Sequence, residues 1–363
     1  MSLPLRDVAL GPRTTLGVGG SAQYFWEVTS EQELTLAVRW AKARGLPLRV
    51  LGGGSNVVVA DAGFAGLVIH VALRGVETSG SDPVEVRVGA GEPWHPFVLS
   101  RVAEKQQGIE CLAGIPGSVG ATPIQNVGAY GQDVSETIAR VEAYDIEHEC
   151  FRTFDTRALR FGYRDSFFKS QAPDAFIVTR VHFQLVPGAP PALRYAELER
   201  EAQRIREAAE VDALGVTEVC QVVLGLRRKK SMSVDACDEN HRSCGSFFTN
   251  PRVPTAQVER VAREVPAEPV PQHPEPGGLV KLPAAWLIER AGLAKGVRRG
   301  SVGLSTRHSL AIVCHDGATA NDVLRFAHEV RATVLDKFGV TLEPEPVFWG
   351  FPAGSGGLPP LPT

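Results

Sequence analysis

Residues 114–131 read GIPGSVGATPIQNVGAYG, and this stretch does most to decide the fold. It contains five glycines and two prolines but few polar side chains, so it differs from an ordinary hydrophilic loop. Small residues and fixed turns suit a backbone that lies against a flat ligand and presents N–H and C=O groups to its polar edge. The alternative is a buried irregular loop without a ligand. The absence of charged side chains disfavours a metal site.

A second glycine-rich segment, Gly52-Gly53-Gly54-Ser55-Asn56, lies between two expected strands at 48–51 and 57–59. Successive N–H groups of such a segment can form an anion-binding concavity, with Ser55 and Asn56 as further donors. A plain hairpin turn explains this segment equally well. A P-loop would need a following Gly-Lys-[Ser/Thr], and a Rossmann fingerprint would need a following helix, so both are excluded.

Hydrophobic periodicity around these segments predicts a mixed chain of helices and strands. Helices are expected after a capping box at Ser30 and Glu33, over 94–106, over 217–228, and from Val323 to Val334 with Gly339 closing the last. Strands are expected over 48–51, 57–59, 67–71, 84–88, 138–145 and 176–185. The proline-rich residues 264–278 are expected to form a surface loop, and the Gly/Pro-rich residues 351–363 a disordered tail.

Composition limits the class of protein. The chain has 363 residues, of which 44% are hydrophobic, enough for two or three domains. Its 38 basic and 41 acidic residues nearly balance, so neither nucleic acid nor an anionic membrane is an expected partner. No signal peptide and no membrane-length apolar run is seen. The six cysteines are scattered without a C-x-x-C pair, which favours reduced thiols in the cytoplasm and no metal.

The two glycine-rich segments occur together with other blocks in a fixed order. These blocks are Tyr163-Arg164-Asp165-Ser166-Phe167-Phe168-Lys169, Gly245-Ser246-Phe247-Phe248-Thr249-Asn250-Pro251, Lys281-Leu282-Pro283-Ala284-Ala285-Trp286-Leu287-Ile288-Glu289 and Leu342-Glu343-Pro344-Glu345. In combination they resemble the UDP-N-acetylenolpyruvoylglucosamine reductase (MurB) family. The resemblance extends from about residue 17 to residue 350.

This resemblance implies an α+β chain with a two-part FAD-binding fold of the vanillyl-alcohol-oxidase (PCMH) type and a C-terminal α/β substrate-binding domain. The expected boundaries are 1–72 and 73–228 for the two FAD-binding subdomains and 229–350 for the substrate domain. FAD would be bound non-covalently, and NADPH would be the hydride donor. The substrate would be the enolpyruvyl UDP-sugar of peptidoglycan synthesis, reduced by a cytoplasmic monomer to UDP-N-acetylmuramate.

The resemblance also assigns the cofactor site to the two glycine-rich segments. The residues expected to bind FAD are Gly52, Gly53, Gly54, Ser55, Asn56, Ile115, Pro116, Gly117, Gly120, Ala121, Thr122, Gln125, Asn126, Gly128, Ala129, Tyr130 and Gly131.

Three residues are expected to be catalytic. Hydride transfer to the enolpyruvyl group places negative charge beside its carboxylate, so the reaction needs a cation there and a proton donor. A guanidinium is always charged and can bind a carboxylate with two N–H groups, which suits Arg164, although an isolated arginine is more often a surface ion-pair residue. Ser246 matches the family's proton donor, although most serines form caps or turns. Glu345 matches the family's catalytic glutamate, with Glu343 as its competitor.

The expected substrate-binding residues are less specific. Tyr195 resembles the tyrosine that covers uridine in the subgroup with an extra loop, which implies a type I enzyme. The further candidates are Tyr163, Lys230, Asn250, Lys281 and His308. Solvated polar positions are the competing interpretation for Lys230, Asn250 and Lys281, and a structural histidine for His308.

The sequence departs from the family pattern at several points. Pro346-Val347 follows Glu345 where the family has a valine and a basic residue, so the local strand pairing is open to question. The segment between Lys230 and Gly245 is longer than in enterobacterial-type enzymes. Cys244 replaces an alanine and competes with Ser246 as proton donor.

Two other functions are compatible with parts of the sequence. The first is another FAD-dependent oxidase of the same superfamily, acting on a sugar or alcohol. Such oxidases often carry FAD on a histidine, but neither His70 nor His95 lies in a recognised motif for that bond. The second is a non-catalytic nucleotide-sugar binding protein, which would not need Arg164, Ser246 and Glu345 together.

Overall fold

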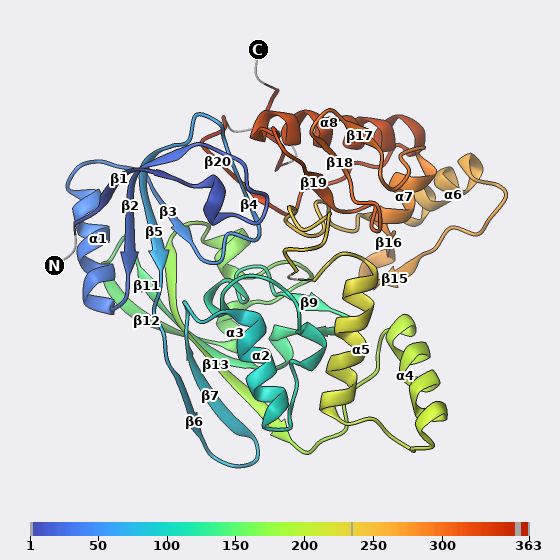
Figure 1. Ribbon diagram of the computed structural model, residues 1–363, viewed down its shortest axis with the longest axis horizontal. Helices are drawn as coiled ribbons and strands as arrows, with labels where there is room; N and C mark the ends of the chain where they lie inside the picture. The colour runs from blue at the N-terminus through green and yellow to red at the C-terminus, as the bar shows by residue number, and fades with distance from the viewer. Residues whose placement is uncertain (1–2, 234, 353–356, 362–363) are drawn as a thin grey trace. The chain divides into compact units, whose positions relative to one another are not determined.

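The computed structural model describes residues 3–233, 235–352 and 357–361, and it divides the chain into two structural units (Figure 1). The first unit holds the described residues of Met1–Asp7, Gln23–Gly53 and Ala65–Val234. The second holds those of Val8–Ala22, Gly54–Phe64 and Asp235–Thr363. The chain therefore passes from the first unit to the second inside the glycine segment 52–56.

The first sheet of the chain lies mostly in the first unit and has the strand order β1-β2-β5-β3. Its strands are β1 (Leu5–Ala9), β2 (Ser21–Val28), β5 (Phe64–Val71) and β3 (Leu48–Leu51). Helix α1 (Glu31–Lys42) buries Leu34, Ala37, Val38 and Ala41, the spacing of one helical face. The side-chain oxygen of Ser30 accepts a hydrogen bond from Glu33 N–H at 3.2 Å, so the predicted helix start is confirmed.

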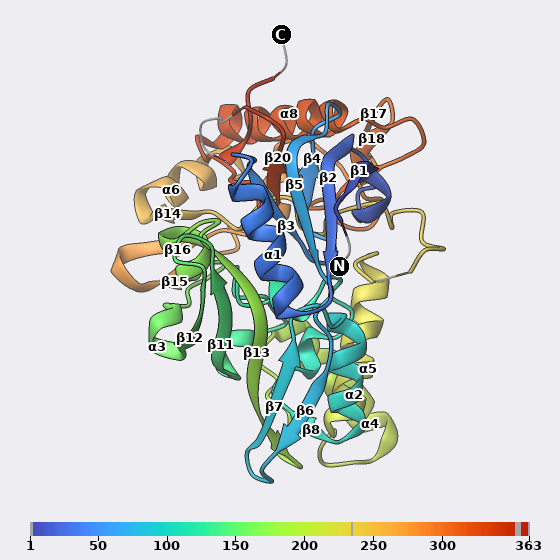
Figure 2. The same ribbon diagram turned by 90° about the vertical axis from the view of Figure 1, so that its left-hand side faces the viewer.

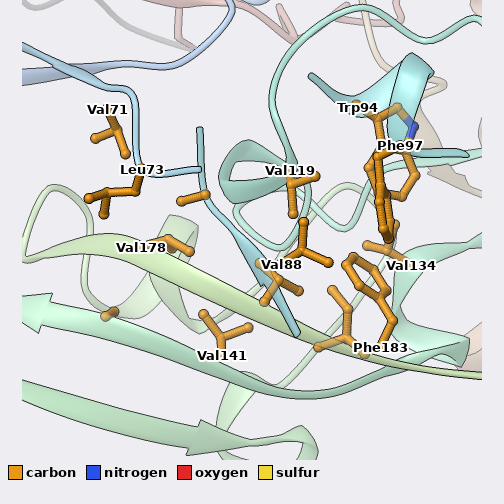
Figure 3. Packing of buried hydrophobic residues seen from close by; sticks show 14 of the residues in the cluster. Val71, Leu73, Val88, Trp94, Phe97, Val119, Val134, Val141, Val178 and Phe183 are labelled. Carbon is orange, nitrogen blue, oxygen red and sulfur yellow. The ribbon is translucent and has the colours of Figure 1, made fainter. Parts of the chain in front are cut away.

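The second sheet is antiparallel, with the order β12-β11-β13-β7-β6 (Figure 2). Its strands are β12 (Cys150–Asp155), β11 (Ile138–Asp145), β13 (Phe176–Pro187), β7 (Val84–Gly89) and β6 (Val76–Ser79), with β8 (Gln106–Gln107) pairing with β13. Alternate side chains of one face, among them Val88, Val141 and Phe183, enter the hydrophobic core. Figure 3 shows this core, where Trp94 and Phe97 of helix α2 (Trp94–Ala103) lie against Phe183.

The opposite face of this sheet is charged. His182 is 2% exposed, and its two ring nitrogens lie 3.1 Å from Glu85 Oε1 and 2.7 Å from Glu142 Oε1. Arg87 and Arg180 also contact Glu142. The strands thus carry an apolar face toward the core and a network of ion pairs on the other side.

Helix α2 is shorter than expected. The prediction extended it to residue 106, but it ends at Ala103 because Lys105 adopts a left-handed conformation with φ of 54°. Gln106 and Gln107 then form β8 instead of a fourth helical turn. A lysine gives no sequence signal for such a conformation, whereas a glycine would.

Two helices form a separate small core in the first unit. They are α4 (Ala196–Ala209) and α5 (Val216–Lys229), which lie side by side (Figure 1). Leu198 and Ala202 of α4 pack with Val219, Val222 and Val223 of α5. The prediction placed α5 at 217–228, within one residue of its observed ends, whereas α4 was not predicted. A short helix, α3 (Thr156–Leu159), follows β12.

Small sheets and the helices α6, α7 and α8 surround a hydrophobic core in the described part of the second unit. One sheet has the order β14-β16-β15, and another has the order β17-β18-β19. Their strands are β14 (Arg252–Pro254), β16 (Leu279–Lys281), β15 (His273–Glu275), β17 (Arg298–Arg299), β18 (Val302–Leu304) and β19 (Ile312–Cys314), and the helices are α6 (Thr255–Glu264), α7 (Ala284–Arg290) and α8 (Ala320–Phe338). The predicted loop at 264–278 contains β15, an edge strand, where prolines are tolerated. Helix α8 ends at Gly339 as predicted.

A parallel pair of strands joins distant parts of the chain within the second unit. It consists of β4 (Val57–Val59) and β20 (Val347–Trp349), with Val347 opposite Val57. The strands β3 and β4 on either side of the glycine segment belong to different sheets, so the hairpin-turn interpretation is wrong. Pro346 does not prevent this pairing, because the ladder begins at Val347, whose N–H donates to Asn56 O at 3.1 Å.

The expected tail at 351–363 lies partly outside the described residues. Of its described part, Leu358 is 1% exposed and belongs to the core of the second unit. His328 Nε2 of α8 lies 2.7 Å from Pro359 O. This part of the tail is packed, in contrast to the expectation of disorder. The boundaries 1–72, 73–228 and 229–350 remain predictions. None of the helices in the described residues is long and apolar enough to cross a bilayer.

Candidate functional site

The two glycine-rich segments meet inside the first unit. A Cβ atom added to Gly53 would lie 2.6 Å from Gly117 Cα, and one added to Gly52 would lie 2.4 Å from Ser118 Oγ. The contact at Gly53 is with backbone and is too short for any side chain, whereas the Ser118 hydroxyl could rotate away from a side chain at position 52. Gly53 is therefore required for the close approach of this backbone to Gly117.

The remainder of the glycine segment belongs to the second unit. Gly54 has a φ of 64°, and a Cβ there would lie 2.0 Å from Arg13 O, so only glycine fits. Asn56 Nδ2 donates to Glu345 O at 3.2 Å. Asn56 thus anchors the chain around the expected catalytic glutamate.

The first part of the 114–131 loop is held by backbone hydrogen bonds to residues 90–94. Val119 N–H donates to Glu92 O and Gly120 N–H to Ala90 O, both at 2.8 Å, and Trp94 N–H donates to Gly117 O at 3.0 Å. A Cβ on Gly120 would lie 2.5 Å from Ala90 Cβ. Gly120, an expected FAD-binding residue, therefore has a packing role in this loop.

The second part of the loop is held by its own polar side chains. Thr122 Oγ1 donates to Val119 O at 2.8 Å. Asn126, with φ of 47°, donates from Nδ2 to Gly162 O at 2.9 Å and accepts at Oδ1 from Ser135 N–H at 3.1 Å. Both residues were expected to bind the cofactor, which stays a prediction, and their side chains fix the loop. The loop ends in a hairpin of β9 (Gly128–Ala129) and β10 (Gln132–Asp133).

Arg164 lies against this hairpin. Its Nη2 donates to Gly128 O at 2.8 Å, and its backbone is left-handed with φ of 52°. Lys169 Nζ in turn donates to Arg164 O at 2.7 Å, and Ser166 Oγ donates to Ile124 O at 2.6 Å. The predicted catalytic arginine and the predicted cofactor loop are thus brought together. The unusual backbone of Arg164 directs its side chain to this loop.

Ser246 and Glu345 lie on neighbouring segments of the second unit. Glu345 N–H donates to Phe247 O at 2.8 Å, and Phe248 forms an antiparallel bridge with Pro344. On the other side, Phe247 N–H donates to Leu310 O at 2.8 Å. The backbone next to Ser246 is therefore fixed from both sides, and the Phe247 ring is fully buried. Ser246, the predicted proton donor, therefore directly precedes the residue whose backbone pairs with Glu345, the predicted catalytic glutamate.

Cys244, the competitor of Ser246, is part of the hydrophobic core and only 7% exposed. Burial raises the pKa of its thiol far above the ordinary value, and the nearby Cys314 and Glu345 act in the same direction. A buried thiol with a raised pKa is a weak acid. Ser246, which is half-buried, is the better placed of the two groups.

Tyr195 lies beside the cofactor loop in the first unit. Its ring is 43% exposed and packs edge-to-face on the ring of Tyr130 at 5.5 Å. Lys230 Nζ pairs with Glu197 and lies 5.7 Å from the centre of the Tyr130 ring. Burial raises the pKa of Tyr130 to about 12, so its hydroxyl stays protonated at neutral pH. The predicted residues Tyr130, Tyr195 and Lys230 therefore form one cluster.

Of the remaining predicted substrate residues, Lys281, Asn250 and His308 take part in local interactions of the second unit, and Tyr163 lies in the first unit. Lys281 Nζ pairs with Glu275 at 3.0 Å, and Asn250 Oδ1 accepts from Ala284 N–H at the start of α7 at 2.9 Å. The backbone N–H of His308 donates to Ser305 Oγ at 3.3 Å. Asn250 thus has a structural role as a helix cap. Tyr163 lies next to Arg164, whose guanidinium is 5.4 Å from its ring centre.

Sequence reasoning missed two residues beside the loop, His95 and Arg227. His95 Nδ1 accepts a hydrogen bond from Gly114 N–H at 2.9 Å. Arg227 is only 7% exposed and lies against the same glycine. The sequence holds only a weak signal for Arg227. Its position continues the buried face of α5 at helical spacing, but it also stands in the basic run 227–230, which suggests an exposed residue.

Comparisons with known proteins were made over the whole chain. Residues 237–349 match the family model described as UDP-N-acetylenolpyruvoylglucosamine reductase, C-terminal domain. Residues 22–152 match an FAD binding domain model. Among the described residues, no group of three or more His, Cys, Asp or Glu side chains is placed to hold a metal ion.

Relatives match along nearly the full length. The UDP-N-acetylenolpyruvoylglucosamine reductase of Thermobifida fusca is 46% identical over 353 residues, which cover 95% of this chain and 98% of the relative. That of Mycolicibacterium smegmatis is 44% identical over 354 residues and covers 94% of both chains. The crystal structure of the Thermus caldophilus enzyme (MurB) aligns with a TM-score of 0.66 and 27% identity, covering 96% of this chain and all of that one.

Proposed function

Because the chain belongs to the UDP-N-acetylenolpyruvoylglucosamine reductase family, we propose that Arg164, Ser246 and Glu345 carry out the reaction of that reductase. The chain is an FAD-dependent oxidoreductase that reduces enolpyruvyl-UDP-N-acetylglucosamine in peptidoglycan synthesis. Its fold is the expected flavin-binding fold with the reductase's C-terminal domain. The match at 237–349 leaves the sugar or alcohol oxidase without support, because that domain belongs to the reductase.

The residues of the two glycine-rich segments fit a bound flavin. Gly53 permits a backbone approach to Gly117 that a side chain at position 53 would block. Arg227 places a buried positive charge beside Gly114, where an anionic ligand is favoured. When bound, the flavin supplies hydride exchange, and NADPH is the donor that we propose for it.

Arg164 is proposed to bind the carboxylate of the enolpyruvyl group. Its charge stabilises the negative charge that develops next to that carboxylate during reduction. The hydrogen bond to Gly128 O orients the guanidinium plane before the substrate arrives. We propose Glu345 as a partner at the same carboxylate, where it binds or orients this group.

Ser246 is proposed to donate the proton that completes the reduction. The observation that carries this proposal is the hydrogen bond from Glu345 N–H to Phe247 O, because it places Ser246 and Glu345 on paired segments. A serine hydroxyl is a weak acid, so it acts only from a fixed position toward a strongly basic carbon. The half-buried location of Ser246 beside the buried Phe247 ring limits competition from water.

Tyr163, Tyr195, Lys230, Asn250, Lys281 and His308 are proposed as substrate-binding residues, supported for Tyr195 and Lys230 by their cluster with Tyr130. This cluster also supports a type I enzyme. We propose a monomer in the cytoplasm, where its nucleotide-linked substrate and NADPH are found.

A flavin bleaching assay tests the proposed reaction. The purified protein is expected to be yellow, to lose its flavin absorbance with NADPH, and to regain it when the enolpyruvyl UDP-sugar is added. Bleaching by a free sugar without NADPH would instead identify an oxidase. A protein that never retains flavin would identify a binding module.

A further inference from the structure

Two neighbouring residues at the start of α2 hold the beginning of the cofactor loop. The indole Nε1–H of Trp94 donates to Leu112 O at 3.1 Å, and the backbone N–H of Trp94 donates to Gly117 O at 3.0 Å. Between these two contacts, His95 Nδ1 accepts a hydrogen bond from Gly114 N–H at 2.9 Å. The helix therefore fixes this segment at three points, and the imidazole of His95 provides the middle one.

Gly114 depends on this hydrogen bond because its backbone is buried. Its φ is 78°, a left-handed conformation that suits glycine. A Cβ there would lie 3.0 Å from Leu224 Cδ2 and 3.1 Å from Arg227 Nε, so Gly114 is packed against α5. A buried N–H group that loses its acceptor costs free energy, because water cannot replace that acceptor. Nδ1 of His95 thus keeps Gly114 in its place.

Of these three contacts, the one at His95 is the contact that protonation can break. An imidazole nitrogen accepts a hydrogen bond only while it carries no proton, so we assign the proton of the neutral ring to Nε2. In the charged ring both nitrogens are donors, and Nδ1–H would face Gly114 N–H. The two contacts of Trp94 use indole and peptide groups, which do not titrate near neutral pH. Protonation of His95 therefore releases the middle of the segment while both ends stay fixed.

The surroundings of His95 favour its neutral form. Burial, and then the charge of Arg227, lower the pKa of His95 below the ordinary value of 6.5. His95 is also the second residue of α2, where the positive end of the helix dipole disfavours a cation. The ring is therefore neutral at pH 7, and it becomes charged as the pH falls through the lowered pKa of the folded protein.

The other titratable groups on neighbouring segments leave this balance unchanged. Burial raises the pKa of Tyr130, Cys111 and Cys220, so these groups stay protonated and uncharged at neutral pH. The carboxylates of Glu110 and Glu92 accept hydrogen bonds from backbone N–H groups of other residues, at 2.7 and 2.8 Å. The state of the Gly114 contact thus follows the charge of the His95 ring.

We propose that His95 is a positioning residue whose neutral ring holds the cofactor loop in the shape that binds flavin, so that its protonation weakens flavin binding. The proposal rests on the proposed function, which makes FAD the ligand of this loop. His95 acts through Gly114, three residues before Gly117, which lies against Gly53. Release of Gly114 therefore loosens the loop where the two glycine-rich segments meet.

The first test measures FAD affinity of the flavin-free full chain by fluorescence titration between about pH 4.5 and pH 8. Because one proton is bound, wild-type affinity should fall by up to about tenfold per pH unit below the pKa of His95. His95→Asn should lack this loss, since its Oδ1 can accept from Gly114 N–H and does not titrate. His95→Leu should bind FAD about 5- to 100-fold more weakly even at pH 8, because Gly114 N–H loses its acceptor.

The exposed His273 provides the control, and His273→Asn should follow the wild type at every pH. The same pH profile for His95→Asn as for the wild type would overturn the proposal, and so would wild-type affinity of His95→Leu at pH 8. Wild-type protein that binds no FAD at pH 8 would instead contradict the proposed function.

A second test needs neither a variant nor flavin. In flavin-free wild-type protein labelled with nitrogen-15 glycine, the Gly114 amide signal should shift in one step as the pH is lowered, with a midpoint below 6.5. Its hydrogen exchange, corrected for the intrinsic rate, should become faster across the same step. The Gly120 amide is the control in the same loop, because it donates to a peptide oxygen, Ala90 O, and should stay protected. A Gly114 signal that is constant over this range would overturn the proposal.

Discussion

At the scale of single residues, close backbone contacts define the candidate cofactor site better than polar side chains do. Gly52 and Gly53 touch residues 117–118, and Gly120 packs on Ala90. The polar residues Thr122 and Asn126 turn toward the protein to hold the loop. The glycines of the sequence indicated these segments, but the sequence could not tell a ligand donor from a loop anchor, because both require the same side chains.

Gly53→Ala should impair flavin binding. Its Cβ would lie 2.6 Å from the Cα of Gly117, a contact that only a backbone shift can relieve. We expect FAD to bind at least about tenfold more weakly, which corresponds to a loss of about 1.4 kcal/mol in the free energy of binding. Gly225→Ala in α5 is the control, because no atom lies within 4 Å of its Cβ position. Equal FAD affinity of the two variants, measured by fluorescence titration, would count against this contact.

Cys244→Ala should leave proton transfer nearly intact. The thiol lies in the core of the second unit, and burial raises its pKa, so it is a poor donor. Re-oxidation of the reduced enzyme by substrate, measured by stopped flow, should stay close to the wild-type rate. A loss of two orders of magnitude would assign the proton to Cys244 instead of Ser246.

At the scale of elements, strongly periodic segments were predictable and irregular ones were not. Helix α8 ends at Gly339 as predicted, although it begins at Ala320, before the first residue of the predicted pattern, whereas α2 ends early at the left-handed Lys105. The pairing of β4 with β20 joins Val57 to Val347, a contact that no local pattern reveals. For the same reason the sequence could not reject the hairpin at residues 52–56.

The charged face of the second sheet should make stability depend on pH. Burial acts to raise the pKa of Glu142, but hydrogen bonds from His182 and Arg87 outweigh it, so the pKa is lowered. Because the pKa of Glu142 is lower in the folded protein, its ionised carboxylate stabilises the fold at pH values above the unfolded pKa of about 4.3. This stabilisation is lost as the pH falls through the pKa of the folded protein.

Glu142→Gln should therefore reduce the free energy of unfolding by about 1 kcal/mol at pH 7, a figure that allows for solvent screening. The difference from the wild type should shrink as the pH falls below about 4.3. Urea unfolding across this range measures it. The exposed Glu147→Gln is the control and should show no effect at any pH. A constant difference at all pH values would exclude the ion pairs as its cause.

At the scale of the whole molecule, the predicted blocks are distributed over both structural units. Arg164 and the 114–131 loop belong to the first unit, and Ser246 and Glu345 to the second. These blocks could be predicted only through the resemblance to a family, because residues so far apart in the chain share no local pattern. Arg227 was missed because its role depends on burial, which a basic run does not predict.

The two half-reactions of the Ser246→Ala variant separate proton donation by Ser246 from flavin reduction. Reduction of the flavin by NADPH should be nearly unchanged, because this step needs no proton from Ser246. Re-oxidation by the enolpyruvyl UDP-sugar should slow by about 10²- to 10⁴-fold, the usual contribution of a positioned acid. Equal losses in both half-reactions, or an unchanged second one, would contradict the role of Ser246.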